Sequence, residues 1–185
     1  MPVRKIKEKL LRKKITGEQK RSIRNKKLLP WDEIRTIGIL YQVPEEADYV
    51  KFTDYVSRLH ADRKEVMTLG MTPTKEVPHY CYPKLYFSYF SRKEVNWMGK
   101  TSGTALNDFI PREFDLLINL DQTGNQVFDC IAGLSRARLK TGVYKQEFSM
   151  VYDLMISTDK TLGNDELLDE VRRWIHSLCP AKSGH

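Results

Sequence analysis

Short apolar runs that alternate with helical stripes constrain this fold more than any other feature of the sequence. The runs have the length of strands and occur at 35–42, 65–71, 85–90, 114–120, 141–144 and 152–157. Between them, apolar residues recur at helical spacing over 45–60, 103–110, 124–137 and 164–178. Alternating strands and helices form right-handed crossovers and a mostly parallel sheet. The sequence therefore predicts an α/β protein, a three-layer Rossmann-like or flavodoxin-like sandwich with five or six strands.

Length and composition divide the 185 residues into two parts. We expect a basic helical extension over residues 1–29 and a single α/β domain over residues 30–185. A domain of about 150 residues buries enough surface to form a core without disulfides. The cysteines, Cys81, Cys130 and Cys179, show neither a disulfide framework nor zinc spacing. Because the sequence has no long apolar run and no secretory signal, we expect a cytoplasmic protein without an integral membrane segment.

The extension itself is expected to form two short helices. Four apolar residues share one face at helical spacing: Val3, Ile6, Leu10 and Leu11. Thr16 and Gln19 have the spacing of a capping box, which predicts that a second helix starts there and runs to about Lys27. We expect the apolar segment 28–31 to end this second helix and to dock on the domain.

Charge is distributed unevenly between the two parts. Residues 1–29 hold twelve basic and two acidic residues, a net charge of +10, whereas residues 30–185 carry −3. Clustered cations attract phosphate backbones. We therefore expect RNA or ribosome binding through Arg4, Lys5, Lys9, Arg12, Lys13, Lys14, Lys20, Arg21, Arg24, Lys26 and Lys27. Two alternatives stay open: an amphipathic anchor that makes peripheral membrane contact, and a solvated or partner-docked extension with neither role.

A second candidate site follows the clearest strand, at 114–120. Ligands of parallel sheets bind outside the carboxyl ends of the strands, and here this position is occupied by Asn119, Asp121, Gly124 and Asn125. Such a loop is suited to hold a ribose, a phosphate or a metal. The alternative is a tight turn in which Asp121 or Thr123 caps the following helix.

Other motifs give no reaction. Gly99-Lys100-Thr101 ends like a phosphate-binding loop, but position 94 is Glu94 where that motif needs a glycine. Helix capping by the hydroxyl residues at 101–104 is the simpler interpretation, with anion binding there as the alternative. The aromatic residues at 79–97 either fill the core or stack bases. Because no catalytic motif occurs, enzymatic activity stays open, and no cofactor or metal is predicted.

Five segments together resemble an uncharacterised family of small Bacteroidota proteins. They are Ile34–Gln42, Phe87–Trp97, Phe114–Leu120, Ala132–Gly142 and Tyr152–Ile156, and the resemblance covers nearly the whole chain, including the extension. It implies an α/β fold but no catalytic residues. The segment Asp115–Leu120, with Ala132-Gly133 and Lys140–Gly142 downstream, is also similar to the N-terminal half of heptosyltransferase-like glycosyltransferases, and this similarity implies a nucleotide-sugar ligand.

Two hypotheses for function result. The first is a non-enzymatic RNA-binding protein, associated with the ribosome, that uses its basic extension. The alternative is a small-ligand or nucleotide-sugar-binding α/β domain, glycosyltransferase-like, with its site at the Asn119–Asn125 loop. The first predicts that RNA binding is lost when the cations of the extension are removed, and the second predicts a concave pocket at the loop.

Overall fold

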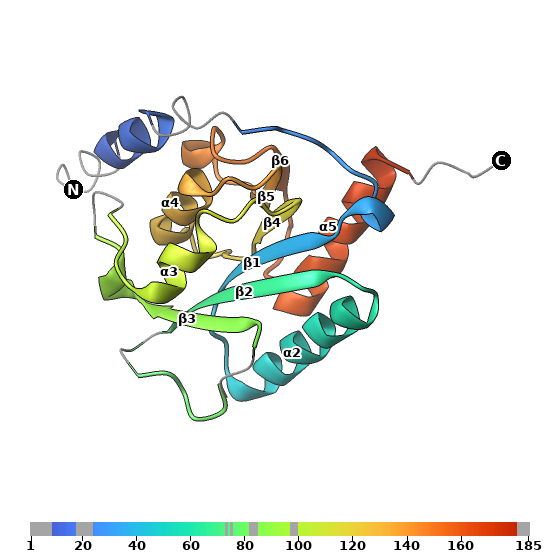
Figure 1. Ribbon diagram of the computed structural model, residues 1–185, viewed down its shortest axis with the longest axis horizontal. Helices are drawn as coiled ribbons and strands as arrows, with labels where there is room; N and C mark the ends of the chain where they lie inside the picture. The colour runs from blue at the N-terminus through green and yellow to red at the C-terminus, as the bar shows by residue number, and fades with distance from the viewer. Residues whose placement is uncertain are drawn as a thin grey trace.

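A single six-stranded sheet forms the centre of the molecule (Figure 1). The computed structural model describes residues 9–17, 24–72, 74, 76–81, 85–96 and 100–180. The strand order is β3-β2-β1-β4-β5-β6, and every neighbouring pair is parallel. The strands are β1 Thr36–Gln42, β2 Glu65–Thr72, β3 Phe87–Ser91, β4 Leu116–Asn119, β5 Leu139–Val143 and β6 Leu154–Ile156. This order is the one of a Rossmann sheet, which confirms the predicted fold class.

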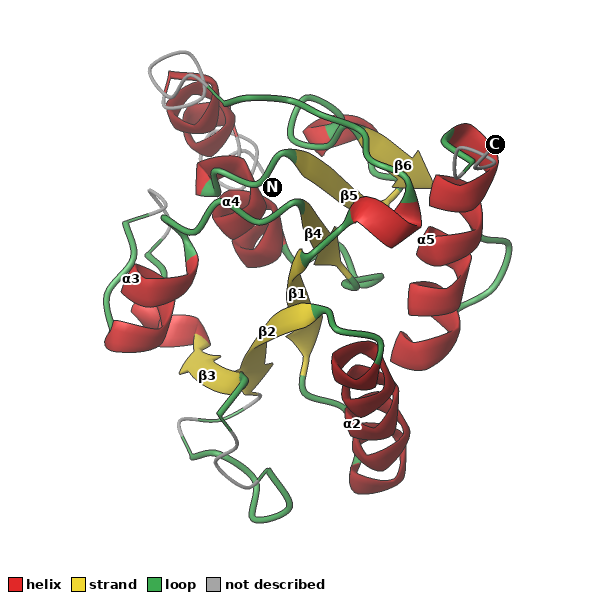
Figure 2. Cartoon of the chain, turned by 45° about the vertical axis from the view of Figure 1, so that its right-hand side comes forward, coloured by secondary structure: helices red, strands yellow, loops and turns green. Residues whose placement is uncertain are grey.

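Helices cover both faces of the sheet and complete the three layers (Figure 2). One face packs against α2 Glu46–Ala61 and α5 Asn164–Leu178. The other face packs against α3 Thr104–Phe109, α4 Gln126–Leu134 and the helical residues 9–17. Within the described residues, three 3₁₀ turns lie in the connections, namely η1 Trp31–Glu33, η2 Arg92–Glu94 and η3 Gln146–Phe148.

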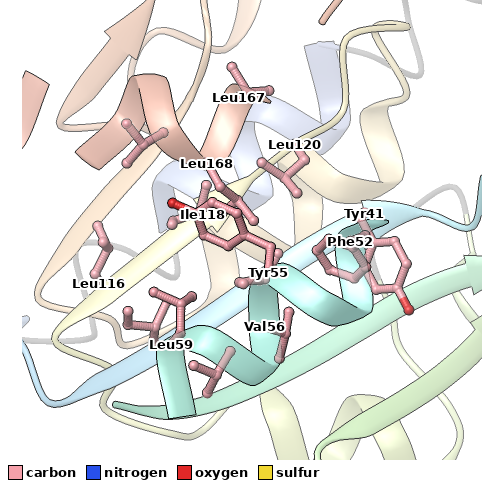
Figure 3. Close-up of a cluster of buried hydrophobic side chains, with 14 of the residues drawn as sticks. Tyr41, Phe52, Tyr55, Val56, Leu59, Leu116, Ile118, Leu120, Leu167 and Leu168 are labelled. Atoms are coloured by element: carbon pink, nitrogen blue, oxygen red, sulfur yellow. The ribbon is translucent and has the colours of Figure 1, made fainter. Parts of the chain in front are cut away.

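Aromatic and branched side chains fill the core between the sheet and the layer of α2 and α5 (Figure 3). Tyr41 of β1 and Phe52 of α2 are fully buried, with their ring centroids 4.4 Å apart. Leu168 of α5 closes the same cluster. The hydroxyl of Tyr55 donates to Asp169 at 2.7 Å and so ties α2 to α5. Complete burial of one such apolar side chain contributes about 1.5–3 kcal/mol, which is why the apolar stripes predict the layers.

Three apolar residues that the helical stripes predict to face inward are exposed instead. Val50 of α2 is 51% exposed, and Trp174 and Leu178 of α5 are 44% and 51% exposed. The apolar stripes of these helices are wider than the surface that the sheet and the neighbouring helix cover. Trp174 keeps a partner at the surface, because its indole N–H donates to Glu170 at 3.2 Å.

Asp115, just before β4, joins the starts of the two central strands. Its Oδ2 accepts hydrogen bonds from the backbone N–H groups of Arg35 at 2.9 Å and Thr36 at 3.1 Å. The hydroxyl oxygen of Thr36 in turn accepts from the Asp115 backbone N–H at 2.9 Å. Arg138 pairs with the Asp115 carboxylate at 3.1 Å. This clasp fixes β1 against β4 at one end and thereby sets which residues meet at the other end.

The helix over residues 9–17 packs on the domain through two side chains. Leu11 is 6% exposed, and Ile15 is fully buried. Ile15 lies on Gly133 of α4, where an added β-carbon would come within 2.5 Å of the Ile15 Cγ2 atom. Only glycine therefore leaves room for this contact. Further along the chain, Leu29 is buried as the docking of segment 28–31 predicts.

The predicted boundaries of a second helix in the extension are wrong. Thr16 caps no new helix, because it continues the helix of residues 9–17 and its hydroxyl donates to the Arg12 carbonyl at 2.9 Å. Residues 24–27, expected to end the second helix, are not helical. Leu10, expected on the apolar face, is 48% exposed. Three more residues of this prediction lie outside the described ones: Val3, Ile6 and Gln19.

Candidate functional site

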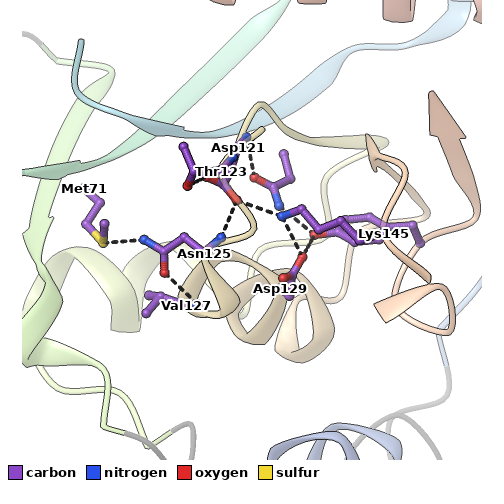
Figure 4. A network of polar contacts seen from close by, with 9 residues as sticks. Met71, Asp121, Thr123, Asn125, Val127, Asp129 and Lys145 are labelled. Carbon is purple, nitrogen blue, oxygen red and sulfur yellow. Dashed lines mark hydrogen bonds and ion pairs between the residues drawn. The ribbon is translucent and has the colours of Figure 1, made fainter. Parts of the chain in front are cut away.

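The loop after β4 is organised by the side chain of Asp121 (Figure 4). Its Oδ1 accepts from the backbone N–H and the hydroxyl of Thr123 at 3.2 and 2.6 Å. Its Oδ2 accepts from the Asn125 backbone N–H at 2.8 Å and from the Lys145 ammonium at 2.7 Å. The loop also needs Gly124, whose φ of 77° lies in the left-handed region. Asp121 is thus a carboxylate with four donors, 2% exposed.

Lys145, two residues beyond β5, places its ammonium between two carboxylates. Besides Asp121 it contacts Asp129 Oδ1 at 3.4 Å. The Asp129 carboxyl is fully buried on α4, and its Oδ2 has no hydrogen-bond partner among the described residues. Burial raises the pKa of Asp129 above its ordinary range, and the charge of Lys145 opposes this rise only in part. For Asp121, burial also raises the pKa, but Lys145 and Thr123 outweigh it and hold the pKa below the ordinary range.

Tyr152 and Asn119 extend this network under the sheet edge. The side-chain amide of Asn119 donates to the Tyr152 hydroxyl oxygen at 2.6 Å. The Tyr152 hydroxyl therefore directs its own proton to Asp129 Oδ1, also at 2.6 Å. Burial raises the pKa of Tyr152 well above its ordinary value, so it stays a neutral donor. The amide oxygen of Asn119 accepts from the Asp121 backbone N–H at 3.0 Å, which closes the network.

The predicted ligand-binding residues thus differ in whether a ligand could reach them. Asn119 and Asp121 are buried at 1% and 2% exposure and engaged in the network, whereas Gly124 is exposed. Asn125 caps α4, because its Oδ1 accepts from the Val127 backbone N–H at 3.2 Å. The alternative prediction that Asp121 or Thr123 caps this helix is therefore wrong.

Sequence reasoning missed three members of the network: Asp129, Lys145 and Tyr152. A usable signal existed for Lys145, since it directly follows the predicted strand 141–144 and so belongs at the same carboxyl edge as Asp121. Asp129 gave no such signal, because an acidic residue inside a helix is usually solvated. Chemically, the site holds one permanent ion pair, one buried carboxyl group of raised pKa and one phenol donor.

Four of the cations predicted to bind RNA lie on the helix of residues 9–17. Lys9 and Lys13 are exposed, and Arg12 and Lys14 are half-buried. No acidic residue occurs within this helix, so it carries +4. Four other predicted cations lie outside the described residues: Arg4, Lys5, Lys20 and Arg21.

Arg24 and Lys26 have structural partners. The Arg24 guanidinium forms a bidentate pair with Asp153, with both N–O distances 2.6 Å, and its side chain is 11% exposed. It also donates to the Ala137 carbonyl at 3.2 Å. Lys26 contacts the same carboxylate at 3.0 Å but keeps its side chain 70% exposed. The last predicted cation, Lys27, is exposed.

Lys140 of β5 is a buried cation close to the ion pair of Arg24 with Asp153. It is 1% exposed, and its ammonium contacts the Gly133 carbonyl at 3.4 Å. Burial lowers the pKa of Lys140 to about 7, and the nearby Arg24 charge acts in the same direction. The Asp153 carboxylate raises this pKa but does not compensate for burial.

The remaining motifs are structural where they are described. Gly103, at the N-terminus of α3, makes no side-chain cap, and Ser102 donates to the Glu94 carbonyl at 3.2 Å instead, so the capping interpretation is wrong. Among the aromatic residues, Phe90 belongs to the core, and the hydroxyls of Tyr49 and Tyr89 are hydrogen-bonded at 2.5 Å. Within the described part of the chain, no cluster of His, Cys, Asp or Glu has the arrangement of a metal site. Its helices are also all too short or too polar to cross a membrane.

The strand order and the two helical layers define a Rossmann-like α/β protein. The chain belongs to DUF6913, a family of unknown function, whose sequence pattern matches residues 7–178. A comparison with curated proteins gives no match. Among solved structures, it is similar to E. coli heptosyltransferase WaaC with ADP-2-deoxy-2-fluoro heptose, with a TM-score of 0.41 and 9% sequence identity. The match covers 80% of this chain, which spans only half of the length of that enzyme.

Proposed function

We propose that this protein is a non-enzymatic RNA-binding protein, associated with the ribosome, that uses the cations of its N-terminal extension. The observation that carries the proposal is the anchored helix of residues 9–17. Leu11 and Ile15 hold one side of it in the core, while its four cations stay at or near the surface. A helix fixed in this way presents its charges without first having to be ordered. With an RNA partner of this kind, the proposal also includes a cytoplasmic location.

The electrostatics of the extension support this function. Lys9 and Lys13 are four residues apart on one helix face, so both ammonium groups can follow one phosphate backbone. Each phosphate that is neutralised releases counterions, which makes such binding strongly salt-dependent. Arg24 is not part of this set in our proposal, because its pairing with Asp153 is better explained as a fastening of the extension to the domain.

The test replaces the four cations of the helix with glutamine in the full chain, as K9Q/R12Q/K13Q/K14Q. Binding to a fluorescent single-stranded RNA is measured by anisotropy at 50 to 200 mM salt, together with co-sedimentation with ribosomes. If all four contact phosphates, the slope of log K against log salt becomes shallower by about 3. Loss of ribosome co-sedimentation at low salt is expected as well.

Arg24→Gln serves as the control that separates docking from RNA contact. It should lower thermal stability while the salt dependence of RNA binding stays close to that of the wild type. Wild-type protein that neither binds the RNA nor sediments with ribosomes sinks the proposal. Binding to anionic vesicles in place of RNA would favour the membrane alternative.

A second candidate function, small-ligand or nucleotide-sugar binding, is favoured by one observation at the carboxyl edge of the sheet. Asp129 Oδ2 is a buried acceptor without a hydrogen-bond partner among the described residues, and the other oxygen of this carboxyl group, Oδ1, contacts the Lys145 ammonium at 3.4 Å. A ligand hydroxyl that reaches this point finds both an acceptor and a donor. The test is a thermal-shift screen with nucleotides and nucleotide-sugars, using Asp129→Asn as the matched variant. No shift of the wild-type melting temperature at millimolar ligand counts against this function.

A further inference from the structure

We infer that the RNA-binding surface continues from the helix of residues 9–17 onto the domain, where Arg92, Lys93 and Lys100 contact the same phosphate backbone. This inference rests on the proposed function, and it names the second half of the interface. All three side chains belong to exposed residues. Because lysine and arginine contacts to phosphates read no bases, the surface recognises the RNA backbone and not a sequence.

The core places the two groups of cations on one side of the sheet. Leu11 and Ile15 belong to the same buried cluster as Phe90 and Val95, which flank η2 on either side. The helix of residues 9–17 therefore packs on the same face of the sheet as the side chains at the end of β3. This face is the one opposite to α2 and α5 (Figure 2).

The surroundings of Cys130 on α4 also indicate that the extension and η2 lie close together. Burial raises the pKa of this thiol to about 11, and the charges of Lys14 and Arg92 both oppose the rise. One cation comes from the extension and the other from η2, so the two positive fields overlap at the same helix of the domain.

Lys100 is held next to η2 by backbone pairing. Val95 and Thr101 form an antiparallel bridge, and the Asn96 N–H donates to the Lys100 carbonyl at 3.0 Å. The Lys100 N–H donates back to the Asn96 side chain at 2.9 Å. The Ser102 N–H donates to the Glu94 carbonyl at 2.8 Å, which fixes the strand end beside the 3₁₀ turn.

The one carboxylate within η2 is directed into the turn. Glu94 Oε2 accepts from the Ser91 backbone N–H at 2.7 Å and completes a capping box. Arg92 uses one N–H for the Val95 carbonyl at 2.9 Å, and a guanidinium has four further N–H groups for a phosphate. The turn therefore presents its cations outward while its acidic group satisfies the backbone.

The opposite layer of the molecule has the opposite charge. Helix α2 carries three acidic and two basic residues, and α5 carries four acidic and two basic residues. On the side of the extension, α3 contributes Asp108 and α4 the buried Asp129, against four cations on the helix of residues 9–17. A polyanion is thus attracted to one face and repelled from the other.

The experiment uses the full chain with an intact extension and the triple variant R92Q/K93Q/K100Q. Its matched control is K51Q/R63Q/R173Q, which removes the same charge from the layer of α2 and α5. Affinity for fluorescent single-stranded RNA is measured by anisotropy over a salt series, with circular dichroism to confirm folding. We expect the first variant to bind at least tenfold more weakly at 100 mM salt, with a slope shallower by about 2, and the control to bind like the wild type.

The outcomes separate this inference from the function on which it rests. If R92Q/K93Q/K100Q binds like the wild type while K9Q/R12Q/K13Q/K14Q loses binding, the domain surface is excluded and the extension still binds RNA. If both triple variants weaken binding equally, only net charge matters and the inference is again overturned. A wild-type protein without RNA affinity overturns both proposals together.

Discussion

At the scale of single residues, the most unusual arrangement is one lysine between two buried carboxyl groups. Asp121 and Asp129 both contact Lys145, but their surroundings differ. Asp121 has four donors for two oxygens, whereas both contacts of Asp129 fall on Oδ1. We therefore expect Asp129 to take up a proton at a higher pH than Asp121 as the pH falls.

The two isosteric variants at this pair should differ in stability. Asp121→Asn leaves the Lys145 charge without its nearer carboxylate and is expected to cost about 3 kcal/mol of unfolding free energy. Asp129→Asn removes a carboxylate whose charge is disfavoured by burial, and it leaves Lys145 paired with Asp121, so the loss should be smaller, about 1 kcal/mol. Urea unfolding at pH 7 measures both, and equal losses for the two variants would contradict this difference between the two carboxyl groups.

The buried Lys140 makes a prediction about pH. Its pKa is lowered to about 7 in the folded protein, against about 10.4 in an unfolded chain. Between these values the unfolded chain binds more protons, so stability rises with pH, and the cost of the buried ammonium is complete below pH 7. Lys140→Met should therefore stabilise the protein at pH 6, by at least about 1 kcal/mol, with a gain that shrinks toward pH 10. Melting curves from pH 6 to 10 test this, and a gain independent of pH would refute it.

Sequence could indicate some of these residues and not others. The sequence indicates Asn119, Asp121 and Asn125 as site residues, because they lie at the end of an apolar strand, at the edge of the sheet where ligands bind. The sequence does not indicate their roles, because Lys145, the partner of Asp121, lies in another loop. Buried charge in general is invisible in a sequence, because a lysine such as Lys140 has the same letter inside and outside.

At the scale of elements, the contact between the helix of residues 9–17 and α4 decides whether the extension is part of the domain. Sequence periodicity indicates the helix but not its partner, and Gly133 looks like an ordinary helix-weakening glycine. The structure gives it a purpose, as the place that receives Ile15. The prediction that Thr16 starts a second helix failed for a related reason. A threonine hydroxyl satisfies the carbonyl four residues earlier as readily as it caps.

Gly133→Ala tests this contact, because its effect on stability should be opposite to the effect of the same change in an isolated helix. In an isolated helix the change is worth roughly 1 kcal/mol in favour of alanine. Here the new β-carbon meets Ile15, so we expect a loss of about 1–3 kcal/mol. Ile15→Ala alone should cost about 2–5 kcal/mol and should make Gly133→Ala harmless in the double variant. A double-mutant cycle by denaturant unfolding measures the coupling, and additive losses would show that the two residues do not meet.

At the scale of the whole molecule, the sequence predicts the layers better than the order within them. Alternating apolar runs and helical stripes identify all six strands, since each run buries enough surface to enter the sheet. They leave Rossmann-like and flavodoxin-like orders open, because any apolar run can pair with any other. The order depends on where the chain turns back, and this is the step from β3 to β4 across the sheet.

That order predicts how protection is distributed over the sheet. β1 and β4 are central and buried, whereas β3 and β6 form the edges and are only partly buried. We expect amide hydrogens of β1 and β4 to exchange only by global unfolding and those of β3 and β6 to exchange faster through local opening. Hydrogen exchange read by mass spectrometry checks this, and edge strands as protected as the centre would contradict it.

The clasp at Asp115 has a consequence for the chain during its synthesis. Thr36 and Asp115, which it joins, are 79 positions apart. During translation, β1 and β2 are complete long before β4 exists, so one edge of β1 stays open in the growing chain. An open apolar strand edge is a template for pairing with other chains. The strand at the centre of the finished sheet is thus the one most exposed to aggregation in the growing chain. How long it stays exposed depends on how soon residues 115–119 are synthesised.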